Sequence, residues 1–232
     1  MLEEGLVSII IPTYLEAENI QDLLERSVYV LEAESAIKYE ILVIDDDSSD
    51  GTLDIAQKVL ENRGKVIRRV SGIKSLSLSV LDGIKEARGD IIVIMDGDGS
   101  HPPELIPLFV RNLKEGYDLV IGSRYIRGGG TRNFPLSRKI ISRLACLLGR
   151  IVSGVKDNTS GFLAIRKKAL EGVVFTSSGF KIGLEIFVKA HVNRFKEVPY
   201  VFVNRTKGKS KLRIKTIIEY LYQISVLLRS KF

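Results

Sequence analysis

Short apolar runs alternate with amphipathic stretches through the first half of the chain. Each run is rich in Val, Ile and Leu, as expected for a strand buried on both faces of a parallel sheet. The runs lie at residues 7–11, 41–44, 66–67, 91–95 and 119–121. The stretches between them, such as residues 20–31 and 76–87, carry apolar residues at helical spacing. This alternation predicts an α/β fold with a doubly wound, mainly parallel sheet flanked by helices.

Carboxylates follow three of the predicted strands. Glu16 comes after the first strand, residues 45–47 end and follow the second, and Asp96 and Asp98 follow the fourth. Ligands of open α/β sheets bind outside the carboxyl ends of the strands, so we expect these groups at one edge. Two like charges so close together repel each other unless a cation lies between them, and carboxylate oxygens suit Mg²⁺ or Mn²⁺. The pattern favours a metal-bound phosphate site.

A simpler interpretation of the same residues is a strand-to-helix turn. Asp and Gly are good turn formers, Ser100 or His101 would cap the helix, and residues 102–103 would start it. If Asp98 only stabilised such a turn, Asp98→Asn would leave turnover intact.

Composition bounds the class of protein. A chain of 232 residues with 45% hydrophobic residues is large enough to bury one sizeable core, and we expect one main domain. Cys146 is the only cysteine, which excludes an internal disulfide. No secretory signal stands at the N-terminus, so a reducing compartment is expected.

Positive charge is concentrated in two regions. Residues 204–232 hold eight Lys and Arg against one Glu, which gives the same +7 as the whole chain. The interval between Asp118 and Asp157 contains no carboxylate. Its basic residues are Arg124, Arg127, Arg132, Arg138, Lys139, Arg143, Arg150 and Lys156. Both regions predict an anionic partner: a phosphate, a lipid headgroup or a nucleic acid.

Glycine-rich phosphate-binding motifs are missing where a nucleotide-binding sheet often has them. Residues 12–16, after the first strand, lack the Gly-x-Gly-x-x-Gly pattern, and no Walker sequence occurs. The phosphates of a ligand must therefore be held by metal and arginine.

Five segments in register carry a family resemblance that spans nearly the whole chain. They are residues 10–16, 43–52, 95–104, 121–125 and 157–162. In type and order they resemble the family 2 inverting glycosyltransferases of the GT-A fold, and within these the polyprenyl-phosphate (dolichol-phosphate) mannosyltransferases. Leu15 departs from the Asn usual in the family, and Ser75 from the Gly of its Lys-Gly-Leu motif.

The resemblance implies a metal-dependent, inverting transfer of a hexose to a polyprenyl or dolichyl phosphate, with mannose from GDP-mannose as the favoured donor. It implies nucleotide-binding roles for Pro12, Tyr14, Glu16, Asp45, Asp47 and Lys74. The implied catalytic residues are Asp96, Asp98, Arg124 and Arg138. The implied ligands of Mg²⁺ or Mn²⁺ are Asp98 and Ser100. The implied contacts of the acceptor phosphate and lipid are Arg132, Arg138, Ser142, Arg205 and Lys211.

Elementary chemistry independently favours a phosphate acceptor. A sugar hydroxyl needs a general base, whereas a phosphate monoester with a second pKa of about 6 is largely ionised at neutral pH. The site must then supply charge stabilisation for the departing diphosphate and in-line placement of the acceptor oxygen.

Two amphipathic segments are candidates for contact with a membrane. No window of about 18 uninterrupted apolar residues exists, so we expect no membrane-spanning helix. Residues 140–152 and 214–228 combine apolar and basic residues, as in helices that lie on anionic lipid. The alternative is two ordinary helices packed on the sheet. We expect a GT-A domain at 1–203, and a basic loop with an amphipathic membrane-surface helix at 204–232.

Partners and alternatives follow from this assignment. We expect a peripheral protein at the cytoplasmic face of a membrane. Because many relatives continue into transmembrane segments, a transmembrane subunit or a longer native chain is expected as well. One alternative donor is UDP-glucose or another UDP-sugar. Another alternative is a non-catalytic nucleotide- or nucleic-acid-binding protein, but the tail has few aromatic residues for base stacking, so no nucleic acid is expected.

Overall fold

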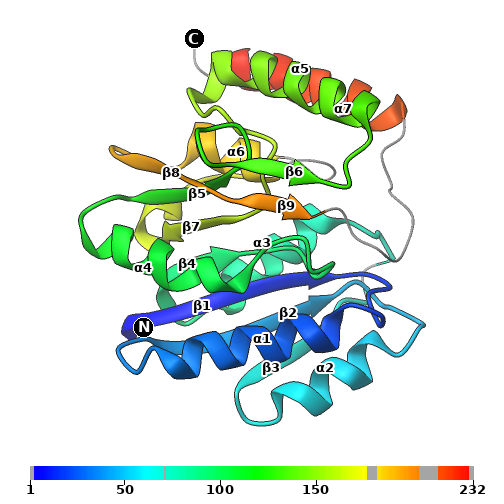
Figure 1. Ribbon diagram of the computed structural model, residues 1–232, viewed down its shortest axis with the longest axis vertical. Coiled ribbons are helices and arrows are strands. Elements are labelled where there is room, and N and C mark those ends of the chain that lie inside the picture. The colour runs from blue at the N-terminus through cyan, green and yellow to red at the C-terminus, as the bar shows by residue number, and fades with distance from the viewer. Residues whose placement is uncertain (1–2, 71, 177–181, 204–213, 230–232) are drawn as a thin grey trace.

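A mainly parallel sheet forms the centre of the molecule (Figure 1). The computed structural model describes residues 3–70, 72–176, 182–203 and 214–229. Among these, the central sheet has seven strands in the order β3-β2-β1-β4-β7-β5-β8. The strands are β1 (Glu3–Thr13), β2 (Lys38–Asp45), β3 (Gly64–Arg68), β4 (Gly89–Ile94), β5 (Leu119–Ser123), β7 (Leu163–Arg166) and β8 (Phe195–Pro199). The predicted α/β class is confirmed.

Strand β7 is the exception to the parallel arrangement. It pairs antiparallel with β4 on one side and with β5 on the other, whereas the remaining neighbours are parallel. Two short strands, β6 (Gly130–Arg132) and β9 (Val201–Val203), form a separate parallel pair. The sequence patterns predicted β1 to β5 and missed the four later strands β6, β7, β8 and β9.

Helices cover both faces of the sheet. They are α1 (Ile20–Ala33), α2 (Thr52–Leu60), α3 (Leu76–Glu86), α4 (Ile106–Lys114), α5 (Leu136–Ser153), α6 (Ile182–Lys189) and α7 (Ile214–Arg229). Two short 3₁₀ turns, η1 (Pro103–Leu105) and η2 (Lys167–Leu170), precede α4 and follow β7. Since the strands alternate side chains between faces, Ile9 and Ile11 of β1 join the core under α1, α2 and α4. Ile10 joins the second core, with α3 and α6.

Helices α5 and α7 form a further layer at one end of the molecule, where they lie side by side (Figure 1). Their contact with α6 is a small apolar cluster that includes Val152, Leu184, Ile224 and Leu227. Helix α5 ends where Gly154 takes a left-handed conformation with φ of 71° and its N–H bonds to the carbonyl of Arg150. In the described residues, no helix is both long enough and apolar enough to cross a membrane.

Candidate active site

The acidic clusters lie together at one edge of the sheet, as predicted. Strands β1, β2 and β4 are adjacent and parallel, so their carboxyl ends share this edge. The register places Thr13 beside Asp45, and Ile10 beside Ile94, two residues before Asp96. The chain after each strand therefore delivers its polar side chains to one place.

Asp45 is fixed by a local network of hydroxyl and amide donors. Its carboxylate accepts from the Thr13 hydroxyl at 2.8 Å, from the Ser48 amide at 2.7 Å and from the Ser48 hydroxyl at 2.7 Å. The Asp45 side chain is fully buried. Such a carboxylate has few accepting positions left, so Asp45 holds the shape of the predicted nucleotide site, whatever it contacts in a ligand.

The next two carboxylates pair with basic residues at the end of β3 and in the loop between β3 and α3. Asp46 forms a buried ion pair with Arg69, whose Nε also donates to Asp82 at 2.7 Å. Asp47 pairs with Arg68 and, at 3.2 Å, with Lys74. Hydrogen bonds from these two cations hold the pKa of the Asp47 carboxyl below its usual value.

Tyr14 and Lys74 contact each other at this edge of the sheet. The Lys74 ammonium lies 5.3 Å from the centre of the Tyr14 ring and donates to the carbonyl of Asp46 at 2.6 Å. Glu16 lies at the start of α1, where its carboxylate accepts from the Asn19 side chain at 2.8 Å. The structure thus brings Tyr14, Glu16, Lys74 and Asp47 to the carboxyl ends of β1 and β2, where a nucleotide role was predicted for them.

Leu15 occupies a backbone conformation that disfavours leucine. Its φ is 57°, in the left-handed region that Asn enters more easily than most other L-residues. This gives a physical reason why the resembling family usually has Asn at this position. Leu15 also anchors the loop, because its amide donates to the Ser48 hydroxyl at 2.8 Å.

Asp96 is positioned by a buried histidine. The Asp96 amide donates to Nδ1 of His101 at 3.0 Å, and the imidazole stacks on Phe162 with ring centres 5.0 Å apart. Burial lowers the pKa of His101, so the ring is neutral with Nδ1 free to accept. The expectation that His101 caps a helix was wrong, because the ring turns inward to the Asp96 backbone. Sequence patterns gave His101 no functional role, since nothing local signals its stacking partner.

Asp98 and Ser100 offer oxygen atoms beside Asp96. The Asp98 carboxylate accepts from the Ser100 amide at 3.1 Å. Ser100 is 3% exposed, and its buried hydroxyl has no hydrogen-bond partner in the described residues. Those residues contain no cluster of three or more His, Cys, Asp or Glu side chains that would cage a metal alone. Two carboxylates and one unpartnered hydroxyl fit Mg²⁺ or Mn²⁺, which commonly takes few protein ligands and completes its shell with substrate phosphates and water.

Arg124 forms a buried, two-pronged ion pair with Asp157. Its Nε and Nη2 donate to the two carboxylate oxygens at 2.7 and 2.6 Å, and Nη2 also donates to the Thr159 hydroxyl at 2.7 Å. Burial alone would lower the pKa of Arg124, but the bonds and charge of Asp157 outweigh burial and raise it. The guanidinium therefore holds the 157–162 segment, and its predicted contact with donor phosphates stays a prediction.

The segment of residues 157–162 connects the acidic edge to the basic end of the molecule. Asp157 binds Arg124, whereas Gly161 lies so near Asp96 that a Cβ there would stand 3.2 Å from a carboxylate oxygen. Between them, Asn158 is fully buried and its carbonyl oxygen accepts from the Tyr220 hydroxyl of α7 at 2.8 Å. We did not predict roles for Asp157 or Asn158, although Asp157 is the first carboxylate after the long basic interval.

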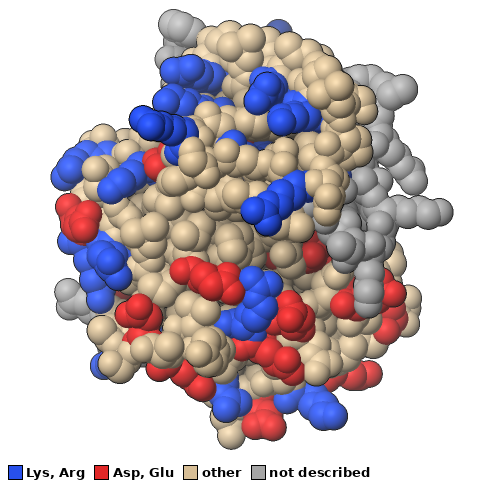
Figure 2. All heavy atoms as spheres, in the orientation of Figure 1, with Lys and Arg blue, Asp and Glu red and all other residues tan. Residues whose placement is uncertain are grey.

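The predicted acceptor residues lie at the basic end. Arg132 is exposed on β6, and Arg138 and Ser142 lie one turn apart near the start of α5. The Arg138 guanidinium stacks over Phe134 at 4.6 Å from the ring centre. In the face shown by Figure 2, basic residues predominate over the end that carries α5, whereas both signs mix below. Arg205 and Lys211 lie outside the described residues.

The fold and this site define the class of the protein. A family model described as glycosyl transferase family 2 matches residues 8–176. The chain belongs to this family of glycosyltransferases.

Within the family, the chain is similar to dolichol-phosphate mannosyltransferases. It is 46% identical over 228 residues to the one from Pyrococcus furiosus, covering 96% of this chain and 64% of that protein. The chain thus spans less than two thirds of that relative. It is 36% identical to the one from Saccharomyces cerevisiae, covering 97% of this chain and 88% of the yeast protein.

Solved structures share the fold at low sequence identity. Mannosyl-3-phosphoglycerate synthase from Rubrobacter xylanophilus superposes with a TM-score of 0.72 and 16% identity, covering 97% of this chain and 73% of that one. Glucosyl-3-phosphoglycerate synthase from Mycobacterium tuberculosis, solved with Mn²⁺, UDP and glucosyl-3-phosphoglycerate, superposes with a TM-score of 0.70 and 18% identity, covering 97% and 79%. These matches support the GT-A assignment of the fold.

Proposed function

We propose that this glycosyltransferase transfers mannose from GDP-mannose to a dolichyl or other polyprenyl phosphate, with inversion at the anomeric carbon. The observation that carries the proposal is the 157–162 segment. Gly161 of this segment lies against Asp96 at the acidic edge, and Asp157 of the same segment is bound by Arg124 at the basic end. A donor diphosphate bound at the first region and an anionic acceptor at the second would then meet across it. The names of the similar proteins support mannose and dolichyl phosphate as substrates.

The chemistry needs no general base. An ionised oxygen of the acceptor phosphate attacks the anomeric carbon, the bond from that carbon to the donor β-phosphate oxygen breaks, and GDP leaves with the electron pair. His101 is unsuited to accept a proton, because it is buried and its Nδ1 is engaged by the Asp96 amide. This agrees with an acceptor that arrives already ionised.

Asp98 and Ser100 would hold a divalent metal, with Asp96 beside them. Such a metal supplies positive charge to the diphosphate oxygens when it is bound. The transfer assay below compares activity with Mg²⁺ and with Mn²⁺. Arg138 and Arg132 would attract the acceptor phosphate, and Arg124 is proposed to face the donor diphosphate while it anchors Asp157.

Helix α5 supports a peripheral position on a membrane, which we propose to be at the cytoplasmic face. Its exposed apolar residues recur every three or four positions and so form one stripe. They are Leu136, Ile140, Leu144, Leu147 and Ile151. A stripe of this kind beside basic residues suits the boundary of an anionic bilayer, where a polyprenyl phosphate resides. A transmembrane subunit is a further proposed partner.

The test is transfer of labelled sugar from GDP-mannose and from UDP-glucose, with Mg²⁺ or Mn²⁺, in detergent with and without dolichyl phosphate. We expect lipid-dependent transfer from GDP-mannose. Transfer from UDP-glucose alone would replace the donor assignment, and salt-sensitive binding of DNA or RNA without any transfer would replace the enzymatic one.

Asp98→Asn supplies the internal control of that assay. Loss of its charge should lower kcat/KM by about 100-fold or more, with unchanged thermal unfolding, if Asp98 holds the metal. Asp54→Asn removes an equal charge from the exposed face of α2 and should leave transfer unchanged. Full turnover in Asp98→Asn would assign Asp98 to the turn alone.

A further inference from the structure

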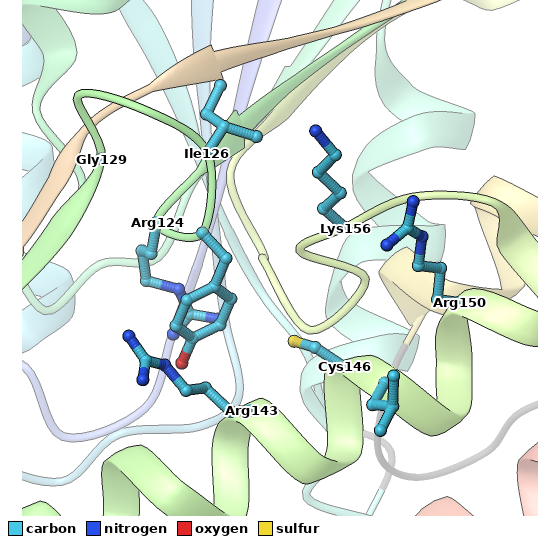
Figure 3. Close-up of a pocket in the computed structure, with 9 residues that line it drawn as sticks. Arg124, Ile126, Gly129, Arg143, Cys146, Arg150 and Lys156 are labelled. Atoms are coloured by element: carbon cyan, nitrogen blue, oxygen red, sulfur yellow. The ribbon is translucent and has the colours of Figure 1, made fainter.

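A basic cavity of about 430 Å³ lies between α5 and the chain that follows β5. It is lined by Arg124, Tyr125, Ile126, Gly129, Arg143, Cys146, Leu147, Arg150 and Lys156. Figure 3 shows Arg150 and Lys156 together on one side, Arg143 on the other, and Cys146 between them. The volume falls within the range of small-molecule binding sites.

Three of the four cations at this cavity have no ion-pair partner among the described residues. Asp157 contacts two of the lining residues, Arg124 and Cys146, and both of its carboxylate oxygens accept hydrogen bonds from Arg124. Across the described residues, Arg143, Arg150 and Lys156 form no salt bridge and all three are exposed. Like charges in one hollow repel each other, so the cavity favours an anion that would lower this repulsion.

One carboxylate lies near the cavity but forms no salt bridge with its cations in the described residues, so its single charge offsets only part of theirs. Glu197 of β8 accepts from the backbone amides of Lys156 and Asp157, each at 3.1 Å. Its oxygens are thus used to fix the loop that presents Lys156. The arrangement leaves the side chain of Lys156 directed into the cavity (Figure 3).

The cavity is on a different face of α5 from the proposed acceptor residues. Because a helix turns about 100° per residue, Arg143 and Arg150 point in nearly the same direction, two turns apart. That direction lies about 110° around the helix from the mean of Arg138 and Ser142. It is next to the exposed apolar stripe, and Leu147, which is 64% exposed, belongs to both stripe and cavity.

The geometry points to this cavity as a binding site for the phosphate group of an anionic membrane lipid, separate from the acceptor phosphate. The two guanidinium groups offer forked donors to phosphate oxygens and Lys156 adds a third cation. The position beside the apolar stripe assigns the source: a phosphate at the bilayer surface reaches the cavity while the stripe enters the acyl boundary. This inference rests on the proposed function in one respect, that a lipid acceptor brings the protein to a membrane.

The test is co-sedimentation of the purified chain with vesicles of phosphatidylcholine, with or without phosphatidic acid. The pocket variant is Arg150→Gln/Lys156→Gln. The matched control, Arg127→Gln/Lys139→Gln, removes the same charge from the same end of the molecule outside the cavity. Both variants lose the diffuse attraction of two surface cations, but only the pocket variant also loses two direct phosphate donors. We therefore expect the pocket variant to bind acidic vesicles about tenfold more weakly than the control. Equal losses in the two variants would overturn the inference.

Two further measurements separate the sources and the sites. Glycerol 3-phosphate in solution should displace the wild-type chain from acidic vesicles only weakly, and binding of this soluble ester as tight as that of vesicles would overturn the lipid assignment. In detergent without anionic lipid, the pocket variant should transfer sugar to a short-chain polyprenyl phosphate at the wild-type rate. Lost transfer with unchanged thermal unfolding would make the cavity the acceptor site and overturn the inference.

The outcome is independent of the donor assignment. If the wild type transfers no sugar from either donor but shows the expected vesicle binding, the proposed function fails and the lipid site stands. Arg150→Lys/Lys156→Arg keeps both charges and should restore most of the binding, which guards against a folding defect in the Gln variant.

Discussion

The acidic edge and the basic end of this molecule differ in how their charges are balanced. At the edge, each of Asp45, Asp46 and Asp47 is held by hydroxyl groups, amides or paired cations of the protein itself. At the other end, Arg143, Arg150 and Lys156 are exposed, form no salt bridge in the described chain and adjoin an apolar stripe open to solvent. One region carries its counter-charges within the fold, and the other must obtain them from outside.

This contrast indicates how the two regions work. Fixed hydrogen-bonding groups cost little reorganisation when a nucleotide binds, so the edge is preorganised. Uncompensated cations beside apolar residues gain most when a polyanionic surface and its lipid cover them together. The join between the two is the 157–162 segment, and variants around it test whether the regions are truly coupled.

The strongest test of that join is the buried pair of Arg124 and Asp157. Arg124→Met leaves a fully buried carboxylate without its cation, which should lower the free energy of unfolding by about 3–5 kcal/mol. Adding Asp157→Asn removes the stranded charge and should recover part of the loss. Urea denaturation measures both. If transfer stays about 100-fold low in the double variant, Arg124 also acts on the diphosphate.

An exposed ion pair provides the control for this cycle. Arg26 and Glu104 lie 2.9 Å apart, but both side chains are well exposed, at 39% and 50%. Arg26→Gln should therefore lower the free energy of unfolding by less than about 1 kcal/mol.

The double variant also has an outcome that would contradict a direct role of Arg124 in transfer. Recovered turnover in the Arg124→Met/Asp157→Asn chain would limit Arg124 to holding the 157–162 segment.

The attachment of α7 to the join is tested at Gly149 of α5. A Cβ at this position would stand 2.3 Å from both the Asn158 carbonyl oxygen and the Tyr220 hydroxyl. Gly→Ala in a helix normally stabilises by up to about 1 kcal/mol, but here we expect destabilisation by about 2 kcal/mol from overpacking. Thermal unfolding reports the sign. Ile151→Ala, at a site 73% exposed, should be nearly neutral, and a stabilised Gly149→Ala would contradict the packing of α7 on Asn158.

A paired carboxylate near the amino end of β2, away from the acidic edge, should show a similar built-in charge balance as sensitivity to acid. Burial alone would raise the pKa of Glu40 on β2, but hydrogen bonds from Ser8 and Arg88 outweigh burial and lower it. The native state then binds this proton less readily than the unfolded chain. The stabilisation is present above the ordinary pKa of 4.5 and is lost as the pH falls through the lowered native value.

Glu40→Gln should reduce the free energy of unfolding by about 1–2 kcal/mol at neutral pH. Its deficit relative to the wild type should shrink as the pH falls below the ordinary carboxyl pKa. Denaturant titrations at a series of pH values measure this difference. A deficit that stays constant down to the acid transition would mean that the charge of Glu40 contributes nothing.

The smallest expected effect concerns the strained loop of the edge. Leu15→Asn should raise the free energy of unfolding by about 1 kcal/mol, because Asn tolerates the left-handed φ of 57° better than Leu. Leu15→Ala keeps the strain and should give no gain. Equal stability of the Asn and Ala variants would show that the loop relaxes at no cost.

Much of the fold was readable because its signals are local. The apolar runs that became β1, β2, β4 and β5 have the length and composition of buried strands, and helical spacing marked α1 and α3. Parallel neighbours necessarily share a carboxyl edge, so the position of Asp45 and Asp96 followed from the strands that precede them. The concentration of basic residues between Asp118 and Asp157 was equally visible.

The tertiary structure alone decided how the two regions meet. Strand β7 enters antiparallel between β4 and β5, and this insertion brings Gly161 against Asp96 and Phe162 onto His101. Neither contact has a local signal, because pairing between distant strands depends on the whole sheet and not on the spacing of residues along one segment. The sequence by itself determined which charges this protein carries and at which strand ends they lie. The folded sheet determined which of those charges are neutralised inside the protein and which remain for a ligand.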